Sequence, residues 1–253
     1  MSVVGNYLYG FTDSRFRPAA DLCGLAGARV ETLPFGDVAA LVSRHAVQPL
    51  MPVRTNLEPH HRVVRRVSAE TALVPAAFGH ISATDDELLS VLRANHDEIR
   101  HELERLHGKC EVGLKLSWSV ENIFDYFVRN DRSLRELRDR VFHDREPSLN
   151  DKLQVGAHFE SALARERERL TQILVGTLRP VTCDIVYGAL RDEKTVCNLT
   201  LLVEQARGSE FLDGLRAAAA RFDANFAIVT SGPWPPYSFV QLQLQLTASP
   251  TAA

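Results

Sequence analysis

The sequence predicts an α+β protein of two ferredoxin-like modules, each with the element order β-α-β-β-α-β, and additional long helices in the second module. Two observations lead to this prediction. Alternating apolar stretches typical of half-buried strands recur in both halves of the chain, and amphipathic stretches of helical period lie between them. We place the first module at residues 1–107, the second at 108–246, and a frayed tail at 247–253. The parallel between the halves is one of element order only, because no sequence repeat links them.

Turn and cap signals define the elements of the first module. Pro34-Phe35-Gly36 indicates a turn between two strands, and Asn56 is a suitable N-cap for a helix that holds Pro59 in its first turn. The predicted strands are residues 6–11, 29–33, 37–42 and 73–80. The predicted helices are residues 18–25, ending at Gly27, and 56–71.

A capping box predicts one long helix at the end of the first module. Thr84 is the cap, Glu87 reaches back to it, and Gly108 ends the helix. The apolar stripe of this helix consists of Leu88, Leu92, Ile99, Leu103 and Leu106. Asp85, Asp86 and Glu87 could be read as paired carboxylates for acid–base catalysis, but helix capping and the helix dipole explain them.

The second module is predicted from the same kinds of signal. Its strands are residues 110–118, 181–187, 196–203 and 225–230, and its helices are residues 122–142, 148–176 and 209–222. Ser148 and Ser209 are the expected caps of the last two helices. A hairpin loop at 191–194 places Cys183 opposite Leu202, and the alternating stretch 241–246 predicts an edge strand.

Composition and charge exclude several classes of function. The net charge of −3 and pI of about 6.3 give no general attraction to nucleic acid or anionic lipid. No apolar run approaches the roughly 20 residues of a membrane span, and Met1 to Asn6 lack the basic start of a signal peptide. We therefore expect a cytoplasmic protein.

The residues that usually carry chemistry form no recognisable site. The four cysteines, Cys23, Cys110, Cys183 and Cys197, make no C-x-x-C pair, and we expect the last two to be buried free thiols. His96, His101 and His107 are spaced by five and six residues, whereas two ligands on one helix face need three or four. Phosphate-binding loops and nucleophile elbows are absent from the sequence. We expect no metal, no cofactor and no catalytic centre.

The most informative stretch is Gly232-Pro233-Trp234-Pro235-Pro236-Tyr237-Ser238-Phe239. Its prolines fix the backbone and carry three aromatic rings on a stiff, non-helical strap. Rings held in this way lose little entropy on packing, so they suit either a core edge or a binding surface. Trp234, Tyr237 and Phe239 are therefore candidate partner-binding residues, with core packing as the alternative.

This stretch resembles the GPWPPYSF signature of the gas vesicle protein F/L family (GvpF/GvpL). Three other stretches are similar to family patterns: Tyr7-Leu8-Tyr9-Gly10, the Pro-x-x-Phe-Gly segment within 73–80, and the G-x-x-E-x-x-x-K strand within 108–116. Order and spacing agree over roughly residues 6–240. The chain departs from the family pattern at Ala77 and His80, where an Arg and a Thr are expected.

The resemblance implies a non-catalytic accessory protein of gas vesicle assembly. Its implied partners are the hydrophobic major shell protein, which it would escort or nucleate into the wall, and other gas vesicle accessory proteins. A small-ligand-binding regulatory or enzymatic domain, held between two ferredoxin-like modules, is the alternative, because one fold can host many functions.

Two charged groups are further candidates for partner contacts. Arg62, Arg65 and Arg66 fall on one helix face, near Arg54 and the adjacent His60 and His61, and this cluster suits either an acidic partner surface or solvent. Glu111 and Lys115 lie four residues apart on one strand face. They are expected to form an ion pair, or to contact a partner.

Overall fold

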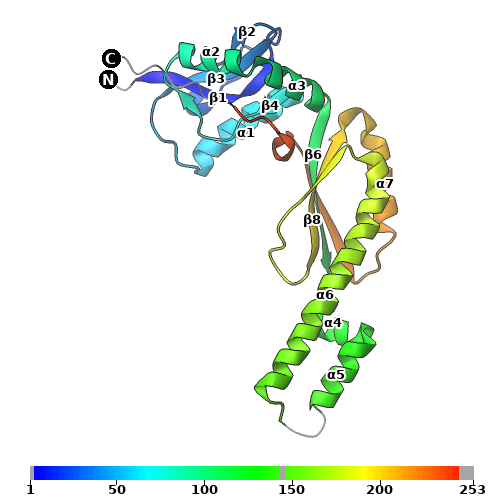
Figure 1. Ribbon diagram of the computed structural model, residues 1–253. Coiled ribbons are helices and arrows are strands. Elements are labelled where there is room, and N and C mark those ends of the chain that lie inside the picture. The colour runs from blue at the N-terminus through cyan, green and yellow to red at the C-terminus, as the bar shows by residue number, and fades with distance from the viewer. Residues whose placement is uncertain (1–2, 143–145, 245–253) are drawn as a thin grey trace. The chain divides into compact units, whose positions relative to one another are not determined.

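The computed structural model describes residues 3–142 and 146–244. It has the predicted α+β character, with two antiparallel sheets (Figure 1). The chain divides into two compact units. The first takes in the described residues of Met1–Glu111, Glu204–Ala206 and Pro233–Ala253, and the second consists of Val112–Val203 and Arg207–Gly232. The second unit is therefore inserted in the chain between parts of the first.

The sheet of the first unit is built around the strand that opens the chain. Its strands are β1 (Val4–Asp13), β2 (Val30–Phe35), β3 (Val38–Ala46), β4 (Leu73–Pro75) and β5 (Ile81–Ser82). They follow the order β2-β3-β1-β4, and β5 also pairs with β1. β1 is buried along nearly its whole length because it lies between two strands and has side chains packed on both faces.

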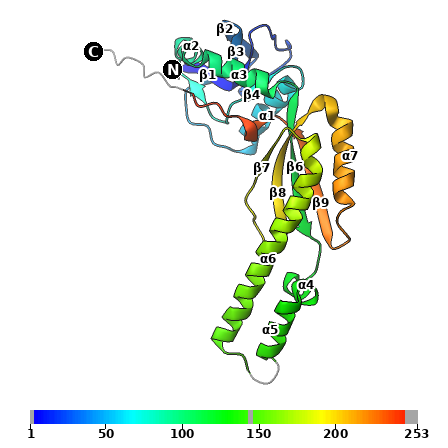
Figure 2. The ribbon, with the colours of Figure 1, turned by 45° about the vertical axis from the view of Figure 1, so that its right-hand side comes forward.

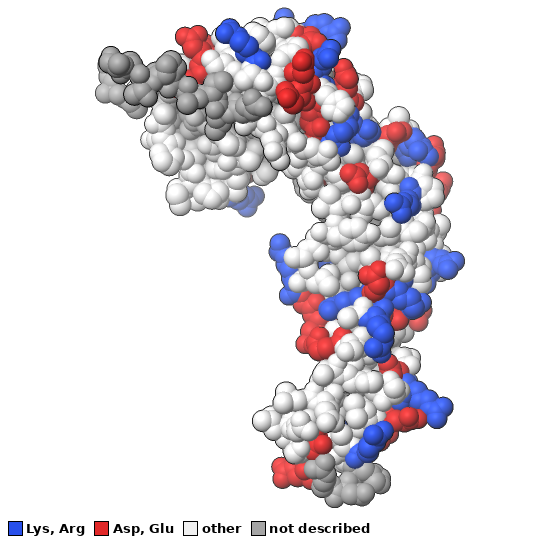
Figure 3. Space-filling view, viewed as in Figure 1, with Lys and Arg blue, Asp and Glu red and all other residues white. Residues whose placement is uncertain are grey.

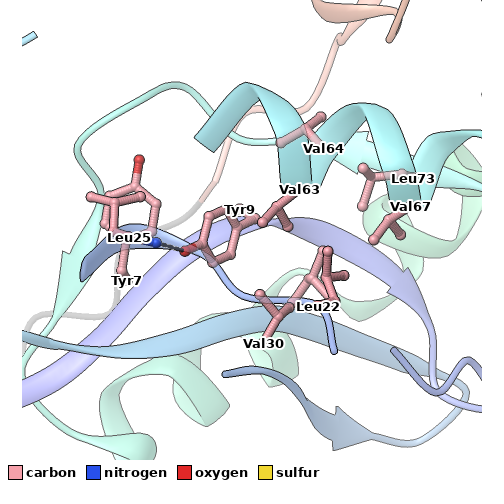
Figure 4. Packing of buried hydrophobic residues seen from close by; sticks show 10 residues of the cluster. Tyr7, Tyr9, Leu22, Leu25, Val30, Val63, Val64, Val67 and Leu73 are labelled. Atoms are coloured by element: carbon pink, nitrogen blue, oxygen red, sulfur yellow. Dashed lines mark hydrogen bonds between the residues drawn. The ribbon is translucent and has the colours of Figure 1, made fainter. Parts of the chain in front are cut away.

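Three helices cover this sheet: α1 (Arg54–Ser68), α2 (Asp85–Ala94) and α3 (His96–Leu106). Figure 2 shows α1 on one face of the sheet and α2 and α3 on the other. The core under α1 joins Val63, Val64 and Val67 to Tyr7 and Tyr9 of β1 (Figure 4). The three valines follow a helical spacing that places them on one side of α1, and this side is the one that the sheet buries.

Two predicted elements in the first part of this unit are wrong. Residues 18–25 form no helix, and only the 3₁₀ turn η1 (Leu25–Gly27) is present, because Cys23 pairs as an extended residue with Arg29. Of the expected strand 73–80, only Leu73–Pro75 forms a strand, β4, and the separate strand β5 begins after it, at Ile81. Because the helix at 18–25 is missing, the predicted β-α-β-β-α-β order is not confirmed for this unit.

The expected long helix after Thr84 is also divided. Thr84 caps α2 as predicted, since its side chain accepts a hydrogen bond from the Glu87 N–H. α2 ends at Asn95, which is buried and whose side-chain amide donates to the Val91 carbonyl at 2.7 Å. An asparagine that bonds to the backbone in this way competes with the helix, and the chain restarts as α3.

The second unit has a four-stranded sheet and the longest helix. Its strands are β6 (Lys109–Trp118), β7 (Asp184–Tyr187), β8 (Thr195–Glu204) and β9 (Phe226–Trp234), in the order β7-β8-β6-β9. Its helices are α4 (Ile123–Asn130), α5 (Arg132–Phe142), α6 (Leu149–Leu178) and α7 (Gly208–Ala219). α6 begins with the predicted cap at Ser148 and runs beyond the sheet to α4 and α5 (Figures 1 and 2).

Several details of the second unit differ from the predictions. The helix expected at 122–142 breaks at Asp131, whose carboxylate accepts the N–H of Leu134 and so caps α5. Arg207, not Ser209, is the N-cap residue of α7. In the hairpin, Asp184 lies opposite Leu202, so the register is shifted by one residue and Cys183 is exposed instead of buried.

The C-terminal predictions also need correction. β9 continues to Trp234, so the first three residues of the expected strap belong to a strand, and Tyr237–Phe239 form a 3₁₀ turn, η4. Residues 241–244 form no strand. Gln245, Leu246 and the tail at 247–253 lie outside the described residues. The module boundaries at 107/108 and 246/247 stay a prediction.

Candidate functional site

After β9 the chain returns to the first unit, and we call Pro233–Phe239 the aromatic segment. Its prolines hold it in a compact turn: the Tyr237 N–H donates to the Pro235 carbonyl at 2.8 Å, and the Phe239 N–H donates to the Pro236 carbonyl at 3.2 Å. Phe239 is only 2% exposed. For this ring the core-packing alternative holds, and a partner cannot contact it without displacing the segment.

Tyr237 is anchored to a buried histidine on α1. Its hydroxyl lies 3.3 Å from Nε2 of His60, and the Tyr7 hydroxyl lies 2.8 Å from Nδ1 of the same ring. The Gly79 N–H donates to the Tyr7 oxygen as well, so Tyr7 connects the buried histidine to the backbone after β4.

The surroundings of His60 keep it uncharged. Burial lowers its pKa from 6.5 to about 4, the nearby His61 and His80 act in the same direction, and a hydrogen bond with the Ala76 backbone opposes them. The ring also stacks on Tyr9, whose hydroxyl accepts the Leu25 N–H at 2.9 Å (Figure 4). His60 thus belongs to the core and not to the solvated basic cluster in which the sequence placed it.

Charged side chains of the first unit hold the backbone that follows Tyr237. Glu102 on α3 is 4% exposed, and its carboxylate accepts from the Arg105 guanidinium and from the Gln241 N–H at 2.7 Å. Arg105 in turn donates to the Phe239 carbonyl. Glu111 at the start of β6 accepts the Ser238 N–H at 2.9 Å. Together these groups bind the main chain at Ser238, Phe239 and Gln241.

The surroundings shift the pKa values of Glu102 and Glu111 in opposite directions. Burial raises the pKa of Glu102, but the Arg105 guanidinium and the Gln241 N–H outweigh it and leave the pKa below its usual value. Burial also raises the pKa of Glu111, where the hydrogen bonds from Ser238 do not outweigh it. The negative charge of Glu102 is therefore stabilised by its surroundings, and that of Glu111 is disfavoured.

Trp234 is the aromatic residue that remains on the surface. It is 41% exposed, and the Arg65 guanidinium lies 5.3 Å from the centre of its ring. A guanidinium over an indole face is attracted by the ring quadrupole. The ring is thus oriented by α1 while part of it stays open to solvent.

The other predicted residues are placed separately. Arg62 donates to the Cys23 carbonyl at 3.4 Å, and Arg66 forms an ion pair with Glu70 at 2.6 Å. These arginines of α1 therefore contact different groups. The expected pair of Glu111 and Lys115 is wrong. Glu111 bonds to Ser238, as above, and the Lys115 ammonium lies 3.3 Å from Asp192.

Sequence reasoning missed His60, Glu102 and Arg105 as the residues that seat the C-terminal chain. A signal for Glu102 was available, because it lies three residues after Ile99 and three before Arg105, in phase with the buried side of its helix. An acidic residue at a buried position indicates a paired charge. Nothing local in the sequence pointed from these residues to Phe239 or Gln241.

Over residues 3–142 and 146–244, no group of three or more His, Cys, Asp or Glu side chains is placed to hold a metal ion. On the face shown in Figure 3, acidic and basic side chains alternate over the helices, without a broad area of one sign. No helix in the described part of the chain has the length and apolar character to cross a membrane.

Comparison with known proteins identifies the family. The model of the gas vesicle synthesis protein GvpL/GvpF family matches residues 5–241. The chain belongs to this family. The finding confirms the resemblance seen in the aromatic segment and in the other family-like stretches.

Named relatives and solved structures agree with this assignment. Gas vesicle protein F of a Streptomyces strain is 29% identical over 244 residues, which cover 94% of this chain and all of that protein. Gas vesicle protein F of Dolichospermum flosaquae is 23% identical over 93% of this chain and 97% of its own length. The crystal structure of GvpF from an Anabaena species has a TM-score of 0.84 at 22% identity and covers 96% of this chain and 100% of that one. The GvpF structure from Microcystis aeruginosa has a TM-score of 0.78 at 19% identity and covers 94% and 99%.

Proposed function

We propose that this protein is a non-catalytic accessory protein of gas vesicle assembly that binds the hydrophobic major shell protein and nucleates or chaperones wall formation. We place it in the cytoplasm, in association with gas vesicles and other gas vesicle accessory proteins. Family membership supports the process, and the named relatives are gas vesicle proteins. No observation favours the alternative of a ligand-binding enzymatic domain. We further propose that both units are variants of the ferredoxin-like fold, since their strand orders correspond.

The proposal rests on Trp234, whose ring is held by Arg65 and is still 41% exposed to solvent. Binding energy concentrates in aromatic and arginine anchors whose conformation is fixed before the partner arrives. The anchors at Tyr237 and Phe239 fix the chain after Trp234, and Arg65 orients the ring itself. An apolar subunit that aggregates in water is a suitable partner for an exposed indole.

The charged candidates have different places in this proposal. Arg65 lies over Trp234, and we include Arg62 and Arg66 of the same helix as rim contacts, where charge affects the association rate more than the affinity. Glu111 acts indirectly, by holding Ser238 and hence the aromatic segment. Lys115 is bonded to Asp192 in the second unit and is proposed as a separate contact.

A binding measurement with purified shell protein tests the proposal. We expect Trp234→Ala to weaken binding by about 2 kcal/mol, roughly thirtyfold, as at a hot spot, while the melting temperature stays nearly unchanged. Tyr187→Ala is the matched control, because Tyr187 is a 62% exposed aromatic residue at the end of β7. Normal binding by a stable Trp234→Ala variant would refute this surface. Failure of the unaltered protein to recover shell protein in reciprocal pull-downs would refute the function.

A further inference from the structure

The outward face of α1 carries an excess of positive charge. The helix contains four arginines and one acidic residue, namely Arg54, Glu58, Arg62, Arg65 and Arg66. All five side chains are exposed, because Val63, Val64 and Val67 turn the opposite side of the helix towards the sheet. The whole chain has a net charge of −3, so this face is opposite in sign to the protein as a whole.

Two of the four arginines are in ion pairs, Arg54 with Glu58 at 3.7 Å and Arg66 with Glu70 at 2.6 Å. Among the residues that the structure describes, no carboxylate lies within ion-pair distance of Arg62 or Arg65. Arg62 donates to the Cys23 carbonyl at 3.4 Å, which is long for a hydrogen bond. Residues three apart on a helix are neighbours on its surface, so two positive charges lie close together here without a carboxylate between them.

The contact between Arg65 and Trp234 adds an apolar group to these charges. The Arg65 guanidinium lies over the Trp234 ring, 5.3 Å from its centre. A guanidinium can hold a ring through its flat face and still donate from the N–H groups at its edge, whose spacing matches the two oxygens of a carboxylate. The indole is 41% exposed, so it offers apolar contact area beside those donors.

The aromatic segment keeps Trp234 beside the arginines of α1. The Tyr237 ring packs edge-on against His61 at 6.1 Å between ring centres, one helical turn before Arg65. The Tyr237 hydroxyl is anchored to His60. Because the segment contacts α1 at both rings, the indole is in position before a ligand arrives, which lowers the entropic cost of binding.

We propose that Arg62, Arg65 and Trp234 bind an acidic segment of a partner protein. A carboxylate side chain of this segment pairs with the two guanidinium groups, and a neighbouring apolar side chain covers the indole. The apolar contact provides most of the affinity, and the charges fix the orientation of the segment. The identity of the partner as the shell protein rests on the proposed function, whereas the chemistry of the segment rests on these three residues.

The size of the charged surface favours a protein segment over a nucleic acid. A nucleic acid is bound by a basic groove that neutralises several phosphates and by rings on which successive bases stack. Here Arg62 and Arg65 stand next to the acidic Glu58, with Trp234 as the exposed ring beside them. A carboxylate with one adjacent apolar side chain fits this area without further positive charge.

Selection from a random peptide library displayed on phage tests the recognition without assuming which partner supplies the segment. The full-length protein is expected to enrich peptides that carry Asp or Glu next to an aromatic or aliphatic residue. A variant with both Arg62→Glu and Arg65→Glu is expected to enrich none of these peptides. Arg100→Glu is the matched control, since Arg100 is an exposed arginine of α3, on the other face of the sheet, and it should select the same peptides as the unaltered protein.

Fluorescence anisotropy with one selected peptide measures the separate contributions. Arg62→Gln and Arg65→Gln should each weaken binding roughly tenfold, as loss of a hydrogen bond between charged groups does. Glu58→Gln should strengthen binding about twofold, because it removes a negative charge beside the site. A peptide with Gln in place of its acidic residues should bind the unaltered protein and the two Gln variants equally.

Each outcome decides the proposal. It is supported if acidic peptides are enriched and their enrichment requires Arg62 and Arg65. It is overturned if the unaltered protein enriches no acidic peptide, if the double Glu variant selects the same peptides, or if a labelled single-stranded oligonucleotide binds with this arginine dependence and acidic peptides do not. Melting temperatures show whether the variants fold, and the single Gln variants decide if the double Glu variant unfolds.

Binding of purified shell protein separates this proposal from the proposed function. Equal binding by the unaltered protein and the double Glu variant would overturn the surface at Arg62 and Arg65 and leave the function standing. Selection of acidic peptides by a protein that binds no shell protein would support the surface and refute the function. Loss of shell-protein binding in the double Glu variant, but not in Arg100→Glu, would support both.

Discussion

The hydroxyl of Tyr237 lies 3.3 Å from Nε2 of His60, although 177 residues separate them in the chain. The intervening chain forms the whole second unit and then returns to complete the core of the first. The family signature around Tyr237 is therefore partly a structural element of the first unit. Of its three rings, Phe239 is buried, Tyr237 is anchored, and Trp234 remains partly open.

Phe239 and Trp234 should differ in their effect on stability. We expect Phe239→Ala to lower the free energy of unfolding by about 3–5 kcal/mol, since a buried ring leaves a cavity. Trp234→Ala should cost only about 0.5 kcal/mol, the lower value for a cation–π contact at a solvent-exposed site, so that its melting temperature stays nearly unchanged. Denaturant unfolding of both variants measures the difference, and equal losses would contradict the assigned burial.

The buried His60 predicts a loss of stability in mild acid. Its pKa is about 4 in the folded protein and near 6.5 when unfolded, so the unfolded state takes up the proton first as the pH falls. The contribution of neutral His60 is fully present above pH 6.5 and is lost between pH 6.5 and 4, by about 3 kcal/mol. The raised pKa of Glu111 acts in the opposite direction.

A histidine comparison isolates this effect. His60→Gln should remove most of the decline between pH 6.5 and 4, although it also lowers stability at neutral pH. His101→Gln, at an exposed position of α3, should leave the decline unchanged. Unfolding free energies measured across this range provide the comparison, and an unaltered slope in His60→Gln would show that other groups cause it.

The clamp of Glu102 and Arg105 should hold the chain after Phe239. Glu102→Ala leaves the Arg105 guanidinium without its buried partner, and we expect a loss of about 3–5 kcal/mol. Hydrogen exchange at the Gln241 amide should become faster in this variant, because its acceptor is removed. Glu136→Ala, which breaks the exposed pair with Arg132, is the control and should change stability by less than about 1 kcal/mol.

Gly24 should tolerate no side chain. A Cβ at this position would lie 1.7 Å from the Tyr9 hydroxyl oxygen, which is itself held by Ser43 and by the Leu25 N–H. We expect Gly24→Ala to destabilise the protein by about 1–3 kcal/mol, as overpacking does. Gly156→Ala in α6 meets no neighbouring atom and should stabilise by about 0.5–1 kcal/mol. Thermal melts of both variants test this contrast.

The sequence by itself determined the features that depend on neighbouring residues. The caps at Thr84 and Ser148 were predictable because a side-chain oxygen and an N–H three residues later suffice to form them. Most strands were predictable from alternating apolar and polar residues, because successive side chains of a strand point to opposite faces of the sheet. The GPWPPYSF stretch indicated the family, which the family model confirms.

Only the tertiary structure decided which distant groups meet. Nothing near Glu111 in the chain shows that its partner is Ser238 and not Lys115, since that choice depends on where the chain returns after β9. The apolar stripe after Thr84 predicted one continuous helix, but the buried Asn95 divides it into α2 and α3. Local propensity is worth a few tenths of a kcal/mol per residue, whereas burial of a large side chain is worth about 1.5–3 kcal/mol, so packing decides where the two disagree.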